Sequence, residues 1–333
     1  MALTARTLCS ADEQTRARAI KKLSSVGSIG WKVFRFFLLC GLCFVLLYPL
    51  LYMLSISFRS MKDIYDPSVI WVSKHWTLDN FKEVIEVMDY KRALLTSLEI
   101  NVVSSLIQVV ICAVVGYGFA RFEFKCKGLL FALVVLTVIV PPQLISTPLY
   151  IYFKGFDFFG IGSLVGLITG TPLTKNLLNT SWVFFLPAIF GQGIKSGLFI
   201  FIFRQFFGGM PRELEDAAQI DGCSFFGCFW RIMIPNVRSG MLVVVVLSLV
   251  WYWNDYFLGS MFISNHRTVM MELVNLPSGL RMLGGYESAA TDPLKIITHM
   301  QAGSLLAIAP VLGFYILIQR FFIQGVERSG IVG

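Results

Sequence analysis

The stretch MPRELEDAAQIDGCSFFGCFWRIMIPNVRSG, residues 210 to 240, is a polar segment between two long apolar stretches. Pro211 suits the first turn of a helix, and three acidic residues favour its positive N-terminal end, namely Glu213, Glu215 and Asp216. Gly222 suits the left-handed position that follows a helix end. A second short helix follows, which we expect to stop at Pro235. The segment therefore predicts two short helices joined by a turn.

The first of these helices has a face of small side chains. At helical spacing one face collects Leu214, Ala217, Ala218 and Asp221. Alanine side chains allow another surface to approach closely, so this face is a candidate contact site.

Long apolar stretches surround this segment and dominate the chain. Of the 333 residues, 56% are hydrophobic and 14% are charged, whereas roughly a quarter of residues are charged in a soluble domain. A bilayer core takes about 20 apolar residues per helix. Six stretches qualify, at 33–57, 96–119, 129–150, 183–207, 239–263 and 300–322. We predict an all-α integral membrane protein whose six core spans lie in residues 31–322, between a tail at 1–30 and a tail at 323–333.

The basic residues favour an orientation with both termini in the cytoplasm. Six spans place the two ends on one side, and Lys and Arg are more frequent on that side, most clearly in ARFEFKCKG at 120–128. The net charge of +8 then reflects topology rather than nucleic-acid binding. We expect the first apolar stretch to remain as an anchor, because no small-residue cleavage pattern follows it. Residues 1–30 are expected to be loosely ordered, with at most a short amphipathic helix.

Two outer features interrupt the regular spans. Pro141 and Pro142 stand near the end of the third span, where we expect a break that faces protein or a cavity. Beyond them GSLVGLITG, residues 162 to 170, is apolar but too short to cross a bilayer. We interpret that piece as re-entrant or interfacial.

Few side chains could carry metal or catalytic chemistry. The seven cysteines fall in spans or on the inner side, which argues against disulfides. The three histidines, at 75, 266 and 299, fall at or beyond the outer span ends, where solvated surface positions are expected. The sequence lacks H-E-x-x-H, G-x-S-x-G and G-x-x-x-x-G-K-[ST]. We predict no catalytic residue, no metal site and no cofactor bound by this chain.

From Asp216 to Pro235 the chain resembles the permease subunits of binding-protein-dependent ABC importers. Their EAA loop runs approximately Glu-Ala-Ala, three residues, Gly, and about a dozen residues to Pro. Here Asp216-Ala217-Ala218 leads to Gly222 and on to IMIP, with Asp in place of the usual Glu. The resemblance covers nearly the whole chain after residue 30. It is strongest to the smaller permease of maltose-transporter type, through WTLDNFKEVI (76–85), YGFARFEFK (117–125), FIFRQFF (201–207), WYWNDYF (251–257) and the C-terminal residues 301–333. Residues 162 to 175 look like extra length.

The resemblance implies an ABC-importer permease fold in which the loop 208–238 carries a coupling helix, seated in a cleft of a separate ATPase. The implied coupling residues are Glu215, Asp216, Ala217, Ala218, Asp221 and Gly222. The implied partners are a homologous permease in a heterodimer, two ATPase subunits that bind ATP and Mg, and an extracytoplasmic substrate-binding protein. The implied location is the bacterial inner membrane.

The implied cargo is a carbohydrate, such as an oligosaccharide, carried by alternating access. An acidic oligosaccharide or a glycerol-phosphate compound is the alternative. A secondary transporter or channel would also be apolar and basic inside. Such a protein would pair ionisable residues through its bundle and would not need a loop shaped for an ATPase cleft.

Two places within the spans are candidates for the substrate cavity. Lys195 falls near mid-membrane in GQGIKSGLF, where an unpartnered ammonium costs about 3 kcal/mol or more. Trp253, Asn254 and Asp255 lie in WYWNDYF, whose aromatic faces could stack on sugar rings. The alternatives are a lysine that snorkels or bonds a freed carbonyl, and an aromatic belt at the interface.

Overall fold

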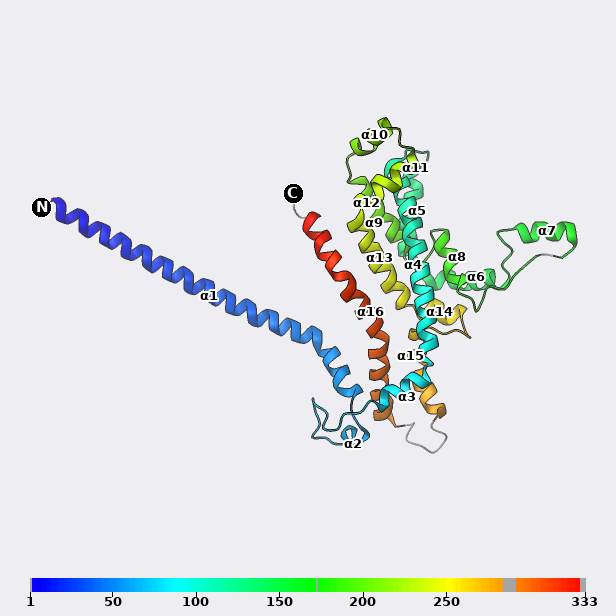
Figure 1. Cartoon of the computed structure of the whole chain (residues 1–333), viewed down its shortest axis with the longest axis horizontal. Coiled ribbons are helices and arrows are strands. Elements are labelled where there is room, and N and C mark those ends of the chain that lie inside the picture. The colour runs from blue at the N-terminus through cyan, green and yellow to red at the C-terminus, as the bar shows by residue number, and fades with distance from the viewer. Residues whose placement is uncertain (1, 172, 284–291, 330–333) are drawn as a thin grey trace.

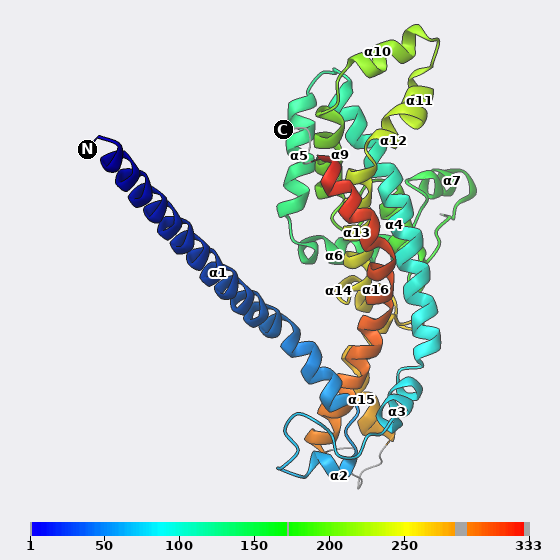
Figure 2. The same cartoon turned by 60° about the vertical axis from the view of Figure 1, so that its left-hand side comes forward.

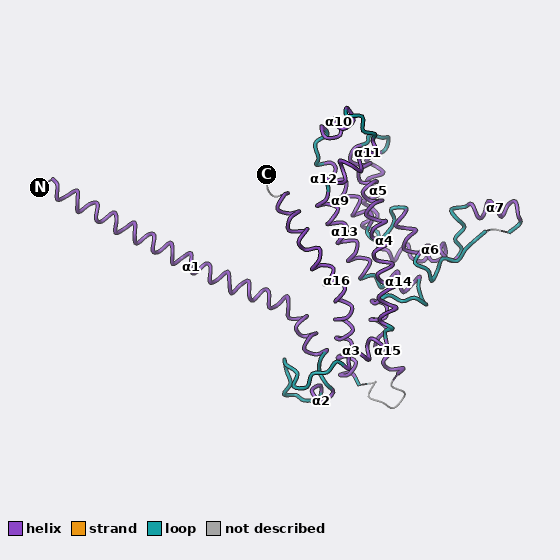
Figure 3. Tube along the Cα trace, viewed as in Figure 1, coloured by secondary structure: helices purple, strands orange, loops and turns teal. Residues whose placement is uncertain are grey.

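The computed structural model describes residues 2–171, 173–283 and 292–329, with residues 2–29 and 321–329 described by their backbone alone. Within these ranges the fold is all-helical. Figure 3 shows helices joined by loops and turns, and the β features of the described part are two isolated bridges, Arg59–Trp76 and Phe156–Lys175.

Five helices form the body of the molecule (Figure 1), namely α4 (Tyr90–Arg121), α5 (Lys127–Ile139), α9 (Ser196–Gly208), α13 (Arg238–Trp253) and α16 (Pro293–Ser329). One end of this bundle carries α10 (Glu213–Ile220), and we call it the α10 end. The opposite end, the α3 end, carries α2 (Met61–Ile64), α3 (Asp79–Val87) and α15 (Val269–Leu283). The small helix α14 (Phe257–Phe262) follows α13.

The first helix, α1 (Ala2–Ser57), leaves the bundle from the α3 end and extends away from it (Figure 2). Residues 2–30 belong to this helix, so the expected loosely ordered tail is instead continuous with the first span. The tail is rich in Ala, Arg, Lys and Leu, which are strong helix formers, and the first proline of the helix is Pro49. At the other end of the chain α16 continues through Ser329, past the expected span end at 322, while residues 330–333 lie outside the described part.

Within the described part of the chain, three helices could cross a membrane by length and composition, Gly30–Ser57, Tyr90–Arg121 and Pro293–Arg320. Two bent pairs raise the number to as many as five. One pair is α5 with α6 (Pro142–Lys154), bent by 98°, and the other is Phe225–Asn236 with α13, bent by 80°. The stretch 183–207, expected as one span, is divided into α8 (Trp182–Ile189) and α9.

Both breaks within the expected spans have identifiable causes. Val140 is extended and Pro142 is at the start of α6, so the break predicted at Pro141 and Pro142 is confirmed. Between α8 and α9, Gly191 and Lys195 both have positive φ, of 69° and 60°. A left-handed residue ends a helix, so residues 190–195 separate the two pieces.

Three buried clusters follow one another along the bundle. The cluster nearest the α10 end is built on Phe199, Phe203 and Phe207 of α9. The middle cluster includes Phe153, Phe184 and Tyr252, and the cluster at the α3 end joins α3, α4, α15 and α16. Helices α4 and α9 pack closely, because a Cβ atom at Gly116 would lie 2.6 Å from the Cβ of Phe203.

The cluster at the α3 end includes a polar contact that the sequence did not predict. His299 was expected at the surface, but its side chain is fully buried. Its Nε2 lies 3.0 Å from Oε2 of Glu83, and its Nδ1 donates to the carbonyl of Lys295 at 2.8 Å. Lys295 Nζ also lies 3.0 Å from the same Glu83 oxygen. We call Glu83, Lys295 and His299 the outer clamp, because it ties α3 to α16.

Candidate functional site

Helix α10 ends in a complete Schellman motif. Gly222 has φ of 81°, as the sequence predicted for a left-handed residue after the helix end. The amide of Cys223 donates to the carbonyl of Ala218 at 2.9 Å, and the amide of Gly222 donates to the carbonyl of Gln219 at 3.0 Å. These two bonds use carbonyls that the helix end would otherwise leave without partners. The end of α10 and the direction of the chain after it are therefore fixed.

One side of α10 is attached to the end of α4. Arg121 Nε lies 3.1 Å from Glu215 Oε1, and the two side chains are only 5% and 12% exposed. The two atoms are within ion-pair distance but are not aligned as a hydrogen bond. Arg121 also donates from Nη2 to the carbonyl of Met210 at 2.9 Å. Ala218 is buried in the cluster at this end of the bundle. From the sequence, Arg121 could be interpreted only as one of the basic residues that favour the cytoplasmic side. Its partner Glu215 is far away along the chain, so no local pattern joins the two.

The opposite side of α10 is open. Asp216, Ala217 and Asp221 are exposed, and Ile220 is 86% exposed at the end of the helix. The face expected from the sequence is thus divided, because Ala218 packs into the bundle while Ala217 points away from it. Ile220 lies three residues after Ala217, so helical spacing would have indicated it.

After α10 the chain forms α11 (Phe225–Cys228), a π-helical turn at Phe229–Met233 and α12 (Ile234–Asn236). The sequence predicted that this second helix stops at Pro235; in the structure it includes Pro235 and ends one residue later, at Asn236. A π turn changes the hydrogen-bond pattern just before the proline, whose missing N–H would interrupt an α-helix.

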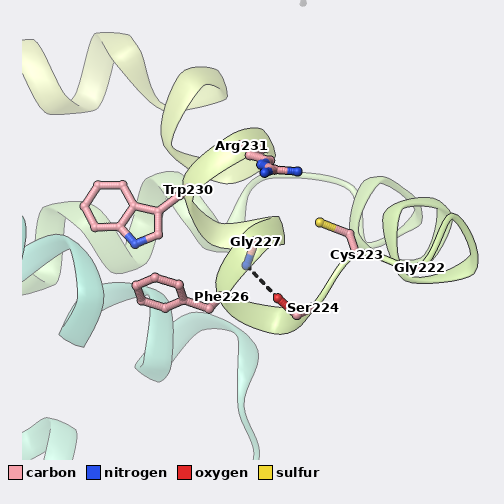
Figure 4. A pocket seen from close by; sticks show the side chains of 7 residues that line it. All are labelled: Gly222, Cys223, Ser224, Phe226, Gly227, Trp230 and Arg231. Carbon is pink, nitrogen blue, oxygen red and sulfur yellow. Dashed lines mark hydrogen bonds between the residues drawn. The ribbon is translucent and has the colours of Figure 1, made fainter.

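A pocket of about 490 Å³ opens between the end of α10 and α11 (Figure 4). It is lined by Gly222, Cys223, Ser224, Phe226, Gly227, Trp230 and Arg231. The oxygen of Ser224 accepts a hydrogen bond from the amide of Gly227 at 3.2 Å, which caps α11.

Of the cavity candidates, Lys195 lies against an aromatic ring. Its Nζ is 5.0 Å from the centroid of Trp251, within cation–π range. Lys195 is the residue before α9 and has φ of 60°. The break therefore places an ammonium at the start of a helix, beside an indole on α13.

The other cavity candidates have partners within the chain. Trp253 is buried, and its Nε1 donates to the carbonyl of Ala307 on α16 at 3.1 Å. Asp255 accepts from the amides of Gly259 at 2.9 Å and Leu258 at 3.4 Å, so it caps α14. Asn254 is exposed and donates to the carbonyl of Val250 at 2.8 Å. The structure brings Lys195 to Trp251, not to these three residues.

Gln108 holds the break between α8 and α9 in place. It is fully buried on α4, and its Nε2 donates to the carbonyl of Ile194 at 2.6 Å and to Ser196 Oγ at 2.9 Å. Ser248 on α13 donates to Gln108 Oε1 at 3.4 Å. Gln108 was not among the site residues predicted from the sequence. An amide in an apolar stretch was the available signal.

Residues 109–327 match the family described as binding-protein-dependent transport system inner membrane component. The match covers more than half of the chain and includes α10, the π turn and the break before α9. The chain belongs to this family. It is accordingly an inner-membrane subunit of a transport system, and the alternative of a secondary transporter or channel is set aside.

Two named relatives of this family member are permeases. The chain is 28% identical over 301 residues to the arabinooligosaccharides transport system permease protein AraQ of Halalkalibacterium halodurans, covering 88% of this chain and 93% of the relative. It is 26% identical over 283 residues to the probable starch degradation products transport system permease protein AmyC of Thermoanaerobacterium thermosulfurigenes, covering 85% and 90%.

The fold matches a crystal structure of a bacterial ABC transporter involved in the import of the acidic polysaccharide alginate. The TM-score is 0.66 at 16% sequence identity, and the match covers 88% of this chain and 96% of that chain. The expected all-α membrane fold of an ABC-importer permease is confirmed.

Proposed function

We propose that this family member is a membrane-spanning subunit of an ATP-driven importer for an oligosaccharide, and that α10 is its coupling helix. One observation carries the proposal. Helix α10 is fixed to the bundle by Glu215 and Ala218 on one side and leaves Asp216, Ala217 and Ile220 open on the other. A helix that is attached to the bundle on one side and exposed on the other can transmit a displacement from a partner protein to the bundle.

The attachment of α10 to α4 can transmit this displacement into the bundle. Arg121 is the last residue of α4, so its ion pair with Glu215 joins α10 to one of the two longest helices of the bundle body. The contact is nearly buried, where an ion pair is screened less than at the surface. Displacement of α10 by a closing ATPase would move the end of α4, and alternating access would follow from that movement.

The proposed assembly contains a second, homologous permease, two ATPase subunits that bind ATP and Mg, and an extracytoplasmic substrate-binding protein. The family description supports a binding protein as partner. A bacterial alginate ABC transporter, whose crystal structure includes a bound periplasmic protein, has the same fold. The termini and α10 then lie in the cytoplasm, in agreement with the basic residues at 120–128.

The cargo proposal rests on the relatives. AraQ and AmyC are named for arabinooligosaccharides and starch degradation products, so a neutral oligosaccharide is the first candidate. An acidic oligosaccharide or a glycerol-phosphate compound is the second, and Lys195 beside Trp251 favours it. An ammonium donates stronger hydrogen bonds to carboxylate or phosphate than to hydroxyl groups.

A pair of alanine variants tests the coupling role. Ala217→Leu adds bulk to the open side of α10 and should abolish copurification with the ATPase, with thermal unfolding of the isolated subunit unchanged. Ala218→Leu adds the same bulk to the buried side and should lower the unfolding temperature. Normal ATPase binding and transport by Ala217→Leu would contradict the proposal.

The cargo is tested by uptake into proteoliposomes that hold the complete complex. Neutral arabino- and malto-oligosaccharides, alginate oligosaccharides and glycerol phosphate are supplied in turn with the binding protein. Uptake and stimulated ATP hydrolysis with a neutral oligosaccharide support the first candidate, and activity with an anionic compound alone supports the second. No response to any carbohydrate, in a complex with basal ATPase activity, would contradict the carbohydrate assignment.

A further inference from the structure

Residues 156–171 and 173–175 form an arm that leaves the bundle and carries α7 (Ile161–Thr169) at its tip (Figure 1). The arm begins and ends at the isolated β-bridge between Phe156 and Lys175. Phe156 and Lys175 exchange two backbone hydrogen bonds, of 3.0 and 2.9 Å, and the amide of Leu177 donates to the carbonyl of Phe153 at 2.9 Å. The base of the arm is therefore a defined structure.

The backbone of the arm bonds largely to itself. The amide of Gly162 donates to the carbonyl of Asp157 at 2.7 Å, and the amide of Leu173 donates to the carbonyl of Gly162 at 3.1 Å. A Cβ atom at Gly162 would lie 2.0 Å from the oxygen of Leu173, so only glycine permits this approach. Thr169 Oγ1 donates to the carbonyl of Val165 at 2.9 Å.

Asp157, the acidic residue of the arm, is also used internally. Its carboxylate accepts from the amide of Gly160 at 3.1 Å and from Ser163 Oγ at 2.9 Å, just ahead of α7. Internal pairing of polar groups is what a segment needs where water is absent. In water the same groups could be satisfied by solvent.

The outward surface of the tip is apolar. Leu167 and Ile168 are each 85% exposed, and Ile161 and Leu164 are also open. The sequence of α7, IGSLVGLIT, contains no charged residue and no aromatic one. The cationic residues Lys154 and Lys175 lie at the base of the arm, not at its tip.

The arm is placed beside the membrane-facing part of the bundle. In Figures 1 and 2 it lies between the levels of the α10 end and the α3 end, and α7 is nearer the α10 end than α6 is. Helices α5 and α6 expose further apolar side chains, among them Ile139, Leu144 and Ile151. The bent pair of α5 and α6, from which the arm leads, qualifies as a membrane span by length and composition.

We propose that the arm is a re-entrant membrane element whose α7 lies among lipid acyl chains. Its self-paired backbone, its uncharged tip and its level in the bundle all suit hydrocarbon, and the two lysines at the base suit the headgroup region. The proposal needs only the membrane location of the family, so it stands or fails independently of the coupling role and the cargo.

Spin labelling of the complete complex in nanodiscs tests this proposal. A label is placed on Ile168→Cys, and on Ile70→Cys as the matched control, in a chain whose native cysteines are replaced and which retains uptake. Ile70 is also strongly exposed but lies in the loop between α2 and α3. Power saturation then compares collisions with oxygen, which enters lipid, and with a water-soluble nickel chelate.

We expect the label at 168 to collide several-fold more with oxygen than with nickel, and the label at 70 to show the reverse. Access to nickel at 168 would place α7 in water, and access to neither reagent would place it against another subunit. Either result overturns the proposal.

A charge substitution provides a second measurement that needs no cysteine replacement. Ile168→Lys should reduce the yield of assembled complex several-fold, because a lysine at the tip would meet hydrocarbon. Ile70→Lys should leave the yield unchanged. Equal yields from the two variants would overturn the proposal.

Discussion

Gly222 is a single residue on which the direction of the chain after α10 depends. A Cβ atom there would meet open space, but φ of 81° is costly for any residue other than glycine. Gly222→Val should cost about 1–2 kcal/mol locally and release the end of α10. We expect ATPase binding and stimulated ATP hydrolysis to fall sharply while membrane insertion is unchanged, as measured on the purified complex.

Two controls isolate the backbone effect at this position. Asparagine tolerates the left-handed region, so Gly222→Asn should retain most of the activity. Gly208 also has open space around it and no positive φ, so Gly208→Val should have a smaller effect. Transport at the wild-type rate by Gly222→Val would show that the left-handed turn is dispensable.

Lys195 is a second residue whose side chain can be tested by itself. Lys195→Met keeps the length of the side chain and the strain of φ 60°, and removes the ammonium beside Trp251. If the cargo is anionic, loss of a charge-assisted hydrogen bond should reduce uptake roughly tenfold or more, with basal ATPase activity intact. Lys195→Arg should retain part of the uptake. Unchanged uptake of an anionic cargo by Lys195→Met would assign the residue a structural role.

The break between α8 and α9 depends on the buried amide of Gln108. Gln108→Leu removes the donor that pairs with the carbonyl of Ile194 and leaves that carbonyl without its side-chain partner. An unsatisfied buried group costs about 1–3 kcal/mol, so the unfolding temperature in detergent should fall measurably. Gln143→Leu, at an exposed position of α6, is the control. Equal unfolding temperatures for the two variants would contradict the assigned role.

Because Glu83 in the outer clamp is ionisable, we expect the free energy of unfolding to depend on pH. Burial by itself raises the pKa of Glu83, but the hydrogen bond and charge of Lys295 and the charge of His299 outweigh it and hold the pKa below its ordinary value of 4.5. A lowered carboxyl pKa stabilises the fold above the ordinary pKa, and this contribution is lost as pH falls through the folded-state value. Since Glu83 is about half exposed, the contribution is at most about 1 kcal/mol.

Thermal unfolding of the wild type and of Glu83→Gln, compared at several pH values, measures this contribution. The wild type should be the more stable protein near pH 7, and the difference should shrink below pH 4.5. A difference that is constant with pH would mean that Glu83 acts through its shape and not its charge.

Sequence patterns predicted those elements whose signals are local. The break at Pro141 and Pro142 and the left-handed Gly222 follow from the conformational limits of single residues. The partners of Arg121, Gln108 and His299 are separated from them by long stretches of chain, so no local pattern could indicate them. For the same reason the sequence could propose Lys195 and Trp253 as neighbours of a cavity but could not tell that Trp251 is the ring beside Lys195.

For the whole molecule, stability is concentrated in the bundle and not in α1. The segment Gly30–Ser57 has none of its apolar window buried within the chain, whereas Phe203 of α9 is fully buried. Phe203→Ala should destabilise the isolated subunit by about 3–5 kcal/mol. Phe37→Ala, the same change at an exposed site of α1, should alter its stability by less than about 0.5 kcal/mol. Equal losses in chemical or thermal unfolding would contradict this division.

The structure differs most from the sequence-based prediction in the tail at residues 2–30. Its basic, polar composition suggested little order, but helix propensity and the lack of a stop signal before Pro49 extend the first span backwards as one helix. The basic, polar composition indicates that the segment lies outside the apolar span, but it does not determine whether the segment is helical.

Helix α1 contacts α16, and this contact has a consequence for biosynthesis. Helix α1 leaves the ribosome early, and residues 58–292 must be translated before α16 begins. At roughly 5–20 residues per second this takes about 10–50 s. During that interval the segment Gly30–Ser57 must persist in the bilayer by its hydropathy alone, since the helix that will contact it does not yet exist. A nascent subunit thus presents an unpaired helix to quality-control proteases until its last helix has been inserted.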